Sequence, residues 1–210
     1  MNITLDPDTF VGSNGIYSTI NDHVFDERRP CEGYMEIFGE NGTNPDDHYV
    51  TLKMNGNGSL AWSQKSMRVS VRESQTAQSG AALEYDLFAG SAVDASGTAI
   101  TEFDTFVLRN SGNDSSHAHF RDALMHRLSE NVNACIQAYR PSLLFINGEF
   151  WGLYNIRERY SPDYFYRHFG IEPENLVMLE SISPLLTGSW NTKYELNEGL
   201  AGDLKALVEL

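Results

Sequence analysis

The first two-thirds of the chain alternates hydrophobic and polar residues over short stretches that end at Gly or Asn. Residues 49–54 and 66–71 alternate with a period of two, as half-buried β-strands do. This pattern predicts a mainly antiparallel β region in which these two strands flank a glycine-rich loop at 55–59. Tight reversals are favoured where Asn precedes Gly, at 14–15, 41–42, 55–56 and 147–148.

In the middle of the chain the pattern changes, and hydrophobic side chains recur every four residues. Phe120, Leu124 and Leu128 follow possible capping residues at 114–116. This spacing is typical of one face of a helix, so we predict a helix over roughly 117–132.

The clearest predicted hairpin covers 142–156, where two hydrophobic strands are joined by Asn147-Gly148. Trp151 and Tyr154 lie in its second strand. Large aromatic residues are common in sheets and cores, so packing is favoured over ligand stacking for both.

Two further helices are predicted near the C-terminus. Ser161 can cap a short helix over 163–169, with Pro162 in its first turn and Gly170 as its stop. A second helical pattern, about 192–210, has no stop signal, so we expect the chain to be cut within a longer protein.

The composition is that of an acidic globular protein, with 210 residues, 41% hydrophobic content and a formal net charge of −14. Such a charge repels polyanions, so we expect no nucleic-acid partner. The acidic surface either favours basic protein substrates or only keeps the protein soluble. The N-terminal residues lack a signal pattern and no run of about 18 apolar residues occurs, so no membrane span is predicted.

Neither a disulfide framework nor a metal site is predicted. Cys31 and Cys135 are far apart and have no ligand spacing around them. Asp114, His117 and His119 lie close together, but two histidines separated by one residue diverge on a helix and no further ligand is evident.

Several short stretches together point to a family. They are GIY at 15–17 with ERRP at 27–30, QKSMR at 64–68, LRN at 108–110 with RDAL at 121–124, and FINGEFWGLYNIRE at 145–158. In this order they resemble the CotH family of spore-coat kinases, and 145–158 is similar to that family's NGEYWGLY segment. The ordered set is more specific than any of its members.

The resemblance implies an α+β fold. A kinase-like N-lobe over 1–156 would have a mainly antiparallel β-sheet with a packed helix, and 157–210 would hold the hinge and the first helices of a C-lobe. It also implies an atypical protein kinase that uses ATP and Mg²⁺ to phosphorylate Ser or Thr of coat or surface proteins. The expected location is the spore coat, the cell surface or the secreted fraction.

Gly56, Gly58 and Ser59 are the candidate phosphate cradle, because residues without a Cβ let backbone N–H groups converge on an anion. An ordinary hairpin turn is the alternative. Leu60 or Ala61 stands where the family pattern has arginine, which weakens the case for charge supplied by the loop.

Three residues are candidates for the phosphate-binding cation and its support. Lys65 would contact the α and β phosphates, with Asp122 on the predicted helix orienting it. Arg68 lies three residues on and would face the other side of the strand unless a bulge intervenes. The alternatives are solvated basic side chains, and for Asp122 a pairing with His126 or Arg121.

Glu158, at the end of the predicted hairpin, is the candidate for binding ribose or fixing the hinge. An ion pair with Arg157 or Arg159 is the alternative.

The family's metal-binding and catalytic acids are expected beyond this chain, because Asp203 is the one aspartate after Glu180. We therefore expect no kinase activity and at most weak nucleotide binding from this chain alone. A non-catalytic coat or surface assembly module that binds a protein partner is the alternative, and a carbohydrate-associated module is a third hypothesis.

Overall fold

The computed structural model describes residues 1–13, 15–18, 30–39, 46–56, 58–73, 81–132, 134–182 and 193–198. The chain divides into two compact units. The first consists of Met1–Val93 and Ala99–Arg159, and the second of Asp94–Thr98 and Tyr160–Leu210.

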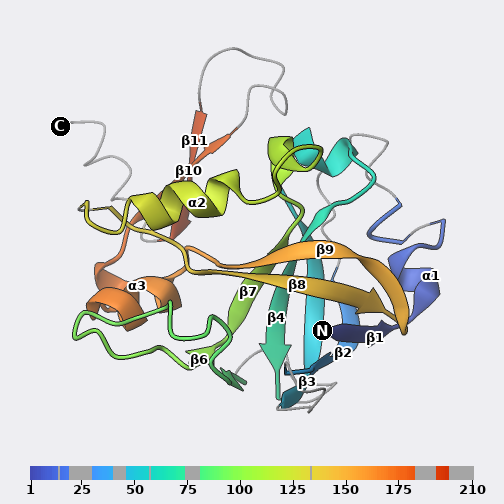
Figure 1. Cartoon of the computed structure of the whole chain (residues 1–210), viewed down its shortest axis with the longest axis horizontal. Helices are drawn as coiled ribbons and strands as arrows, with labels where there is room; N and C mark the ends of the chain where they lie inside the picture. Colours follow the sequence, from blue (N-terminus) through green and yellow to red (C-terminus); the bar gives the residue numbers. More distant parts are fainter. Residues whose placement is uncertain are drawn as a thin grey trace. The chain divides into compact units, whose positions relative to one another are not determined.

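Seven strands of the first unit close into a barrel in the order β1-β2-β3-β4-β7-β9-β8 (Figure 1). All neighbours are antiparallel except β1 and β8, which pair in parallel through Asn2 with Phe145 and Ile3 with Ile146. The strands are β1 (Asn2–Leu5), β2 (Cys31–Ile37), β3 (Asp46–Asn55), β4 (Ser66–Arg72), β7 (Thr105–Arg109), β8 (Tyr139–Ile146) and β9 (Glu149–Glu158).

This closed barrel contradicts the predicted fold, a kinase-like N-lobe sheet with a packed helix and a helical C-lobe. The strands β1 and β2 lie between β3 and β8, so the sheet continues around to meet itself. The helices are few and short, with four residues in α1 (Pro7–Phe10) and eight each in α2 (Arg121–Leu128) and α3 (Pro162–Phe169). The prediction failed because the closing pair joins residues more than 140 positions apart, and no local pattern encodes such a contact.

The barrel interior is filled by alternate hydrophobic side chains. On β3, Val50 and Leu52 are fully buried, and on β4 Met67 and Val69 are as well. Because successive residues of a strand face opposite sides, the residues between them lie on the outer face. A single hydrophobic core therefore fixes which polar residues of β3, β4, β7 and β9 face outward.

The remaining elements of the first unit are short. They are η2 (Gly58–Ala61) between β3 and β4, β5 (Leu83–Glu84) paired with β6 (Glu102–Phe103), and η3 (Gly112–Asp114) before α2. The second unit contains α3, η4 (Pro173–Asn175), β10 (Met178–Ile182) and β11 (Lys193–Glu198), and the last two pair in antiparallel.

The structure confirms the strands predicted at 49–54 and 66–71, which are parts of β3 and β4 and pair with each other. It also confirms the hairpin, formed by β8 and β9. Asn147 and Gly148 have φ of 53° and 81°. Positive φ at both central residues is what a two-residue hairpin turn requires, and Asn and Gly tolerate it best.

The three predicted helices have different outcomes. The helix predicted over 163–169 is confirmed as α3. Ser161 caps its start by accepting a hydrogen bond from the Tyr164 N–H, and Gly170, with φ of 65°, ends it. The helix predicted over 117–132 is real but shorter, since α2 begins at Arg121. The prediction at about 192–210 is wrong over 193–198, which form β11, and the rest lies outside the described residues. In the part of the chain that is described, no helix has the length and apolarity needed to cross a membrane.

Candidate functional site

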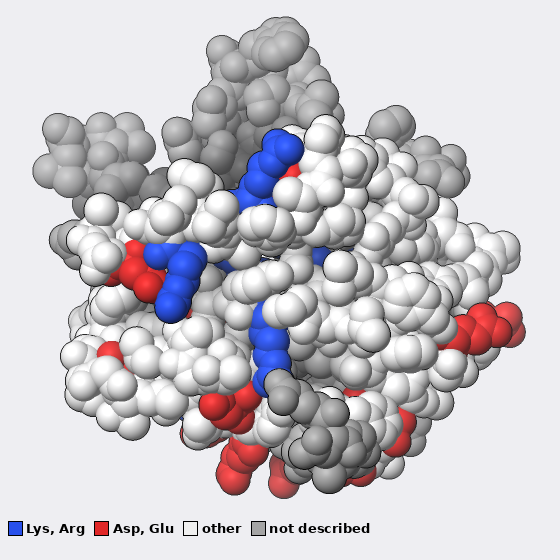
Figure 2. All heavy atoms as spheres, in the orientation of Figure 1, with Lys and Arg blue, Asp and Glu red and all other residues white. Residues whose placement is uncertain are grey.

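A groove with a volume of about 470 Å³ runs along the outer face of β3, β4 and β7. We call it the basic groove, because four of its lining residues are cationic and two are acidic. On the face shown in Figure 2, by contrast, the Lys and Arg side chains lie apart from one another, and some of them lie beside acidic side chains. The groove is lined by Pro30, Glu32, Thr51, Lys53, Arg68, Ser70, Val71, Arg72, Ala81, Asp104, Thr105 and Arg159.

Strand register places two of these cations directly opposite each other. Lys53 on β3 is the cross-strand partner of Arg68 on β4. Like charges at such positions destabilise a sheet, because their Cβ atoms lie only about 5 Å apart. An anion between or above them would remove this repulsion.

A row of hydroxyl side chains crosses the groove beside this pair. Thr51, Ser70 and Thr105 are successive partners on β3, β4 and β7. Two residues along a strand correspond to about 7 Å, so the hydroxyl row and the Lys53–Arg68 pair lie within the span of a polyphosphate. Hydroxyls and cations together are the groups that proteins use to bind phosphate oxygens.

Arg72 closes one side of the basic groove through an ion pair. Its Nη1 lies 2.6 Å from Oε1 of Glu32, and its side chain is 8% exposed while that of Glu32 is 52% exposed. The same nitrogen also donates to the Thr51 hydroxyl at 3.4 Å. Arg72 is therefore fixed by Glu32 and Thr51.

The same face of the barrel continues onto β9, where an aspartate from α2 joins two arginines. Oδ2 of Asp122 lies 3.1 Å from Nε of Arg109 on β7 and 3.0 Å from Nη1 of Arg157 on β9. The Arg157 side chain is 2% exposed, and its strand neighbour Val107 pairs in turn with Arg68. A buried cation needs such a partner, so Asp122 fixes α2 to the sheet.

His126 extends this cluster. Its Nε2 lies 4.0 Å from Oδ1 of Asp122, and its Nδ1 accepts a hydrogen bond from the Gln137 N–H at 2.8 Å. Burial lowers the pKa of His126, and the nearby Arg157 and Arg109 add to this effect while Asp122 opposes it. The ring is therefore held neutral, as its acceptor role at Nδ1 requires.

The loop before α2 is held by buried polar groups. Asn155 on β9 donates to the Ser111 hydroxyl and to the His119 carbonyl, both at 2.7 Å. Asn110 donates to the Gln64 carbonyl at 2.6 Å and accepts from the Ser66 hydroxyl at 2.8 Å. This network positions the start of α2, and with it Asp122.

Asp114 has a structural role in that loop. Its carboxylate accepts from the Arg121 N–H at 3.0 Å and the Ala118 N–H at 3.3 Å, and it pairs with the Arg121 side chain at 3.1 Å. Burial raises the pKa of Asp114, but these hydrogen bonds outweigh it and the pKa is lowered. Among the described residues, no group of three or more His, Cys, Asp or Glu side chains is placed to hold a metal ion.

The predicted phosphate cradle lies between β3 and β4, but part of it is a 3₁₀ helix and not an open glycine loop. Gly56 follows β3 with φ of 112°, and a Cβ added there would lie 2.9 Å from the Ser59 hydroxyl. Gly58 and Ser59 begin the 3₁₀ helix η2. These residues connect β3 to β4, and Gly56, Gly58 and Ser59 do not line the basic groove.

Lys65 does not line the basic groove. Its Nζ donates to the Trp62 carbonyl at 2.7 Å and sits 5.3 Å from the centre of the Tyr17 ring. Lys65 is 6% exposed, and burial lowers its pKa. In the described structure Asp122 orients Arg109 and Arg157 instead of Lys65.

The other two candidates separate. Arg68 lies on the outer face and lines the basic groove. Glu158 is 4% exposed, and its Oε2 accepts from the Ala138 N–H at 2.7 Å while its carbonyl accepts from Gln137 at 2.7 Å. Glu158 therefore holds β9 to the segment before β8.

Sequence reasoning missed four basic residues that the barrel brings to this face, namely Lys53, Arg72, Arg109 and Arg157. Three of them offered a signal, since Lys53 lies in the predicted strand 49–54, Arg72 directly follows the predicted strand 66–71, and Arg109 lies in the LRN stretch. Arg157 was considered only as a partner of Glu158. The register between β4, β7 and β9 could not be read from the sequence.

The model of the CotH family, described as CotH kinase protein, matches residues 52–210. This range includes most of the chain and runs from within β3 through every strand that follows it. The chain belongs to the CotH family. The strands β1 and β2, which close the barrel of this CotH protein, precede the matched range. No curated protein matches the chain.

Proposed function

We propose that this CotH protein binds ATP in the basic groove. In the same proposal, the full-length protein transfers the γ-phosphoryl group to Ser or Thr of a coat or surface protein. The observation that carries the proposal is the placement of Lys53 opposite Arg68 at the edge of a hydroxyl-lined cavity. In a chain with a net charge of −14, such a local excess of cations favours a specific anionic ligand.

The groove fits a polyphosphate better than a simple carboxylate. Its cations are spread along β3 and β4 and extend to Arg159 after β9, instead of converging on one point. A chain of phosphate groups can contact several of them at once, and charge-assisted hydrogen bonds to phosphate oxygens are stronger than neutral ones. The Asp122 cluster fixes Arg109 and Arg157 on the same face, where they add to the positive potential.

The described residues do not fit a magnesium site. The acids of the groove are Glu32, which pairs with Arg72, and Asp104. Mg²⁺ in ATP-dependent transfer needs carboxylates besides the phosphates themselves. We therefore propose no catalytic step within the described part of the chain, and we expect nucleotide binding without phosphoryl transfer from it.

Calorimetric titration of the 210-residue chain with ATP tests the proposal. We expect Arg68→Gln and Lys53→Gln each to weaken binding by about tenfold, since a hydrogen bond to a charged group contributes about 1.5 kcal/mol or more. Arg140→Gln is the matched control, because Arg140 lies outside the groove and donates to the carbonyls of Asp86 and Leu87. Equal affinity in all four proteins, or no binding by the parent, would contradict the proposal.

A second candidate function, a non-catalytic coat or surface assembly module, is favoured by one observation. The outward face of α2 carries several exposed hydrophobic side chains, which mark protein interaction surfaces. If ATP does not bind while the chain associates through α2, this second function replaces the first.

A further inference from the structure

The helix α2 turns a polar side toward the barrel and an apolar side toward solvent, the reverse of an ordinary surface helix. Asp122 and His126, which contact Arg109, Arg157 and Gln137, lie on its inward side, and Ala123 is its buried residue. Its apolar side chains instead face solvent. We call this set the apolar stripe, and it consists of Phe120, Leu124, Met125, Leu128 and Val132, which are 48%, 43%, 60%, 67% and 59% exposed.

An amphipathic helix normally turns its apolar side to the core. Here the inward side is committed to the arginines of the barrel, so the apolar stripe is left for another surface. Beside it lies a groove of about 430 Å³, with Phe88, Ile136 and Tyr139 opposite Ala123 and Leu124. The groove offers a pocket into which side chains of a facing helix can insert.

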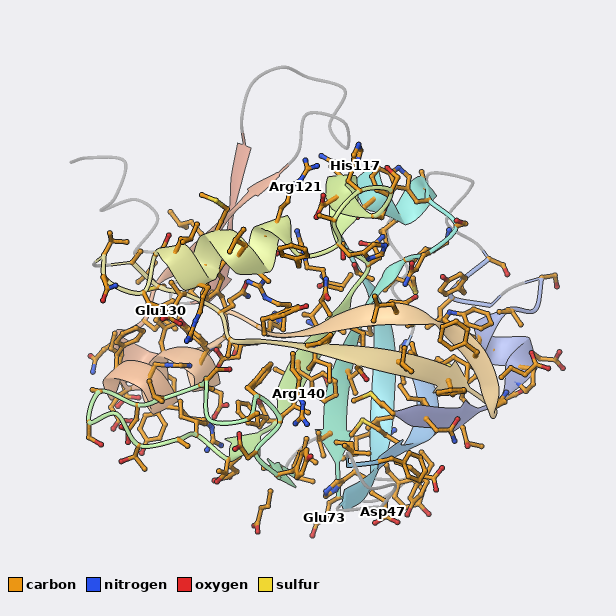
Figure 3. All side chains as sticks on the ribbon, in the orientation of Figure 1. Asp47, Glu73, His117, Arg121, Glu130 and Arg140 are labelled. Carbon is orange, nitrogen blue, oxygen red and sulfur yellow. The ribbon has the colours of Figure 1, made fainter. Side chains whose placement is uncertain are left out.

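The charges at the two ends of α2 are complementary to each other. Arg121 begins the helix with a side chain that is 63% exposed and pairs with Asp114, and Glu130 follows its end with a side chain that is 36% exposed and pairs with Arg127. Figure 3 shows these two labelled residues at opposite ends of α2. The eight residues of α2 span about 12 Å and Glu130 lies beyond them, so Arg121 and Glu130 are too far apart to pair with each other within one chain.

We propose that the apolar stripe binds a second copy of this chain, with the two α2 helices packed in antiparallel. Two-fold symmetry then brings Arg121 of each copy next to Glu130 of the other, so that at each end the Asp114–Arg121 pair of one copy meets the Glu130–Arg127 pair of the other. The apolar stripe is buried against its own counterpart between them. A parallel arrangement would instead place Arg121 beside Arg121, and like charges disfavour it.

This inference does not rest on nucleotide binding, because the apolar stripe and the basic groove share no lining residue. Sedimentation velocity of the chain without nucleotide therefore tests it independently. We expect a monomer–dimer equilibrium in which the fraction of dimer rises as the protein concentration is increased about a hundredfold. Leu124→Glu combined with Leu128→Glu is expected to leave monomer throughout that range. Phe150→Glu is the matched control, since Phe150 is 62% exposed on β9, and it is expected to dimerise as the parent does.

Two charge variants test the orientation. Arg121→Glu alone and Glu130→Arg alone each place like charges at both ends of the interface, so each is expected to dissociate about tenfold more readily. Mixed in equal amounts, the two variants regain both opposite-charge pairs in a heterodimer and are expected to associate as the parent does. Circular dichroism of each variant confirms that it is folded.

Three outcomes would overturn the inference. A parent chain that stays monomeric at every concentration excludes the second copy, even if it binds some other protein. A dimer that persists in the double glutamate variant places the interface elsewhere. A mixture of Arg121→Glu and Glu130→Arg that associates no better than either variant alone rules out the antiparallel arrangement.

Discussion

Replacing Asp122 by asparagine should destabilise the barrel through Arg157. The substitution keeps the size of the side chain but removes the negative charge that lies 3.0 Å from Arg157 and 3.1 Å from Arg109. Removing one partner of a fully buried ion pair costs about 3–5 kcal/mol, because the other charge stays buried. The Arg157 side chain is 2% exposed, but Asp122 is 40% exposed and Gln137 still accepts from Arg157 at 3.3 Å. We therefore expect a loss of about 2 kcal/mol in the free energy of unfolding.

Urea denaturation followed by circular dichroism measures this loss, and the corresponding decrease in Tm is about 6 °C for a chain of this size. Arg109→Gln is the matched control, since Arg109 is 40% exposed and its removal leaves Asp122 paired with Arg157. It should cost less than about 1 kcal/mol. The double variant Asp122→Leu with Arg157→Met should cost less than Asp122→Asn, because no buried charge remains. Equal and small losses for Asp122→Asn and Arg109→Gln would refute the reasoning.

Two further predictions concern His126 and Lys65. Burial and nearby arginines lower the pKa of His126 in the folded chain. As the pH falls below 6.5, the imidazole of the unfolded chain is therefore protonated before that of the folded chain. The contribution of His126 to the free energy of unfolding is complete above pH 6.5 and decreases as the pH drops toward the folded pKa. His126→Gln should lose this part of the pH dependence, measured by urea denaturation from about pH 8 to about pH 5. Lys65→Met should lower stability by about 1 kcal/mol through loss of the hydrogen bond to the Trp62 carbonyl and leave ATP affinity unchanged; a loss of affinity with unchanged stability would return Lys65 to the site.

The sequence predicted those elements whose ends carry strong local signals. Asn147 and Gly148 define a turn that few other residue pairs allow, and Ser161 with Gly170 defines both ends of α3. The start of α2 was placed too early for a physical reason. His119 has φ of 64°, and the Asp114 carboxylate accepts from the N–H groups of Ala118 and Arg121, so the chain turns there before it becomes helical.

Tertiary pairings account for what the sequence could not provide. The interpretation of Lys65 as a phosphate ligand relied on its position before a strand, but the side chain packs against Tyr17, which is 48 residues away. Asp122 was expected to orient Lys65 or to pair with His126 or Arg121, and its position beside Arg109, Arg157 and His126 depends on the register of β7 and β9. Local rules therefore found the acid on the helix and missed the arginines on the sheet.

The inverted orientation of α2 explains both the exposure of the apolar stripe and the placement of Arg109 and Arg157 on the barrel face. A helix whose inward side carries Asp122 can hold Arg109 and Arg157 on the face that continues from the basic groove. The same choice turns Leu124 and Leu128 outward, because side chains that lie four residues apart share one side of a helix. If the apolar side faced inward, Arg157 would be buried without a carboxylate partner. That would destabilise the fold more than the exposure of leucines does. The positive face and the apolar stripe are thus two consequences of one placement of charge on an eight-residue helix.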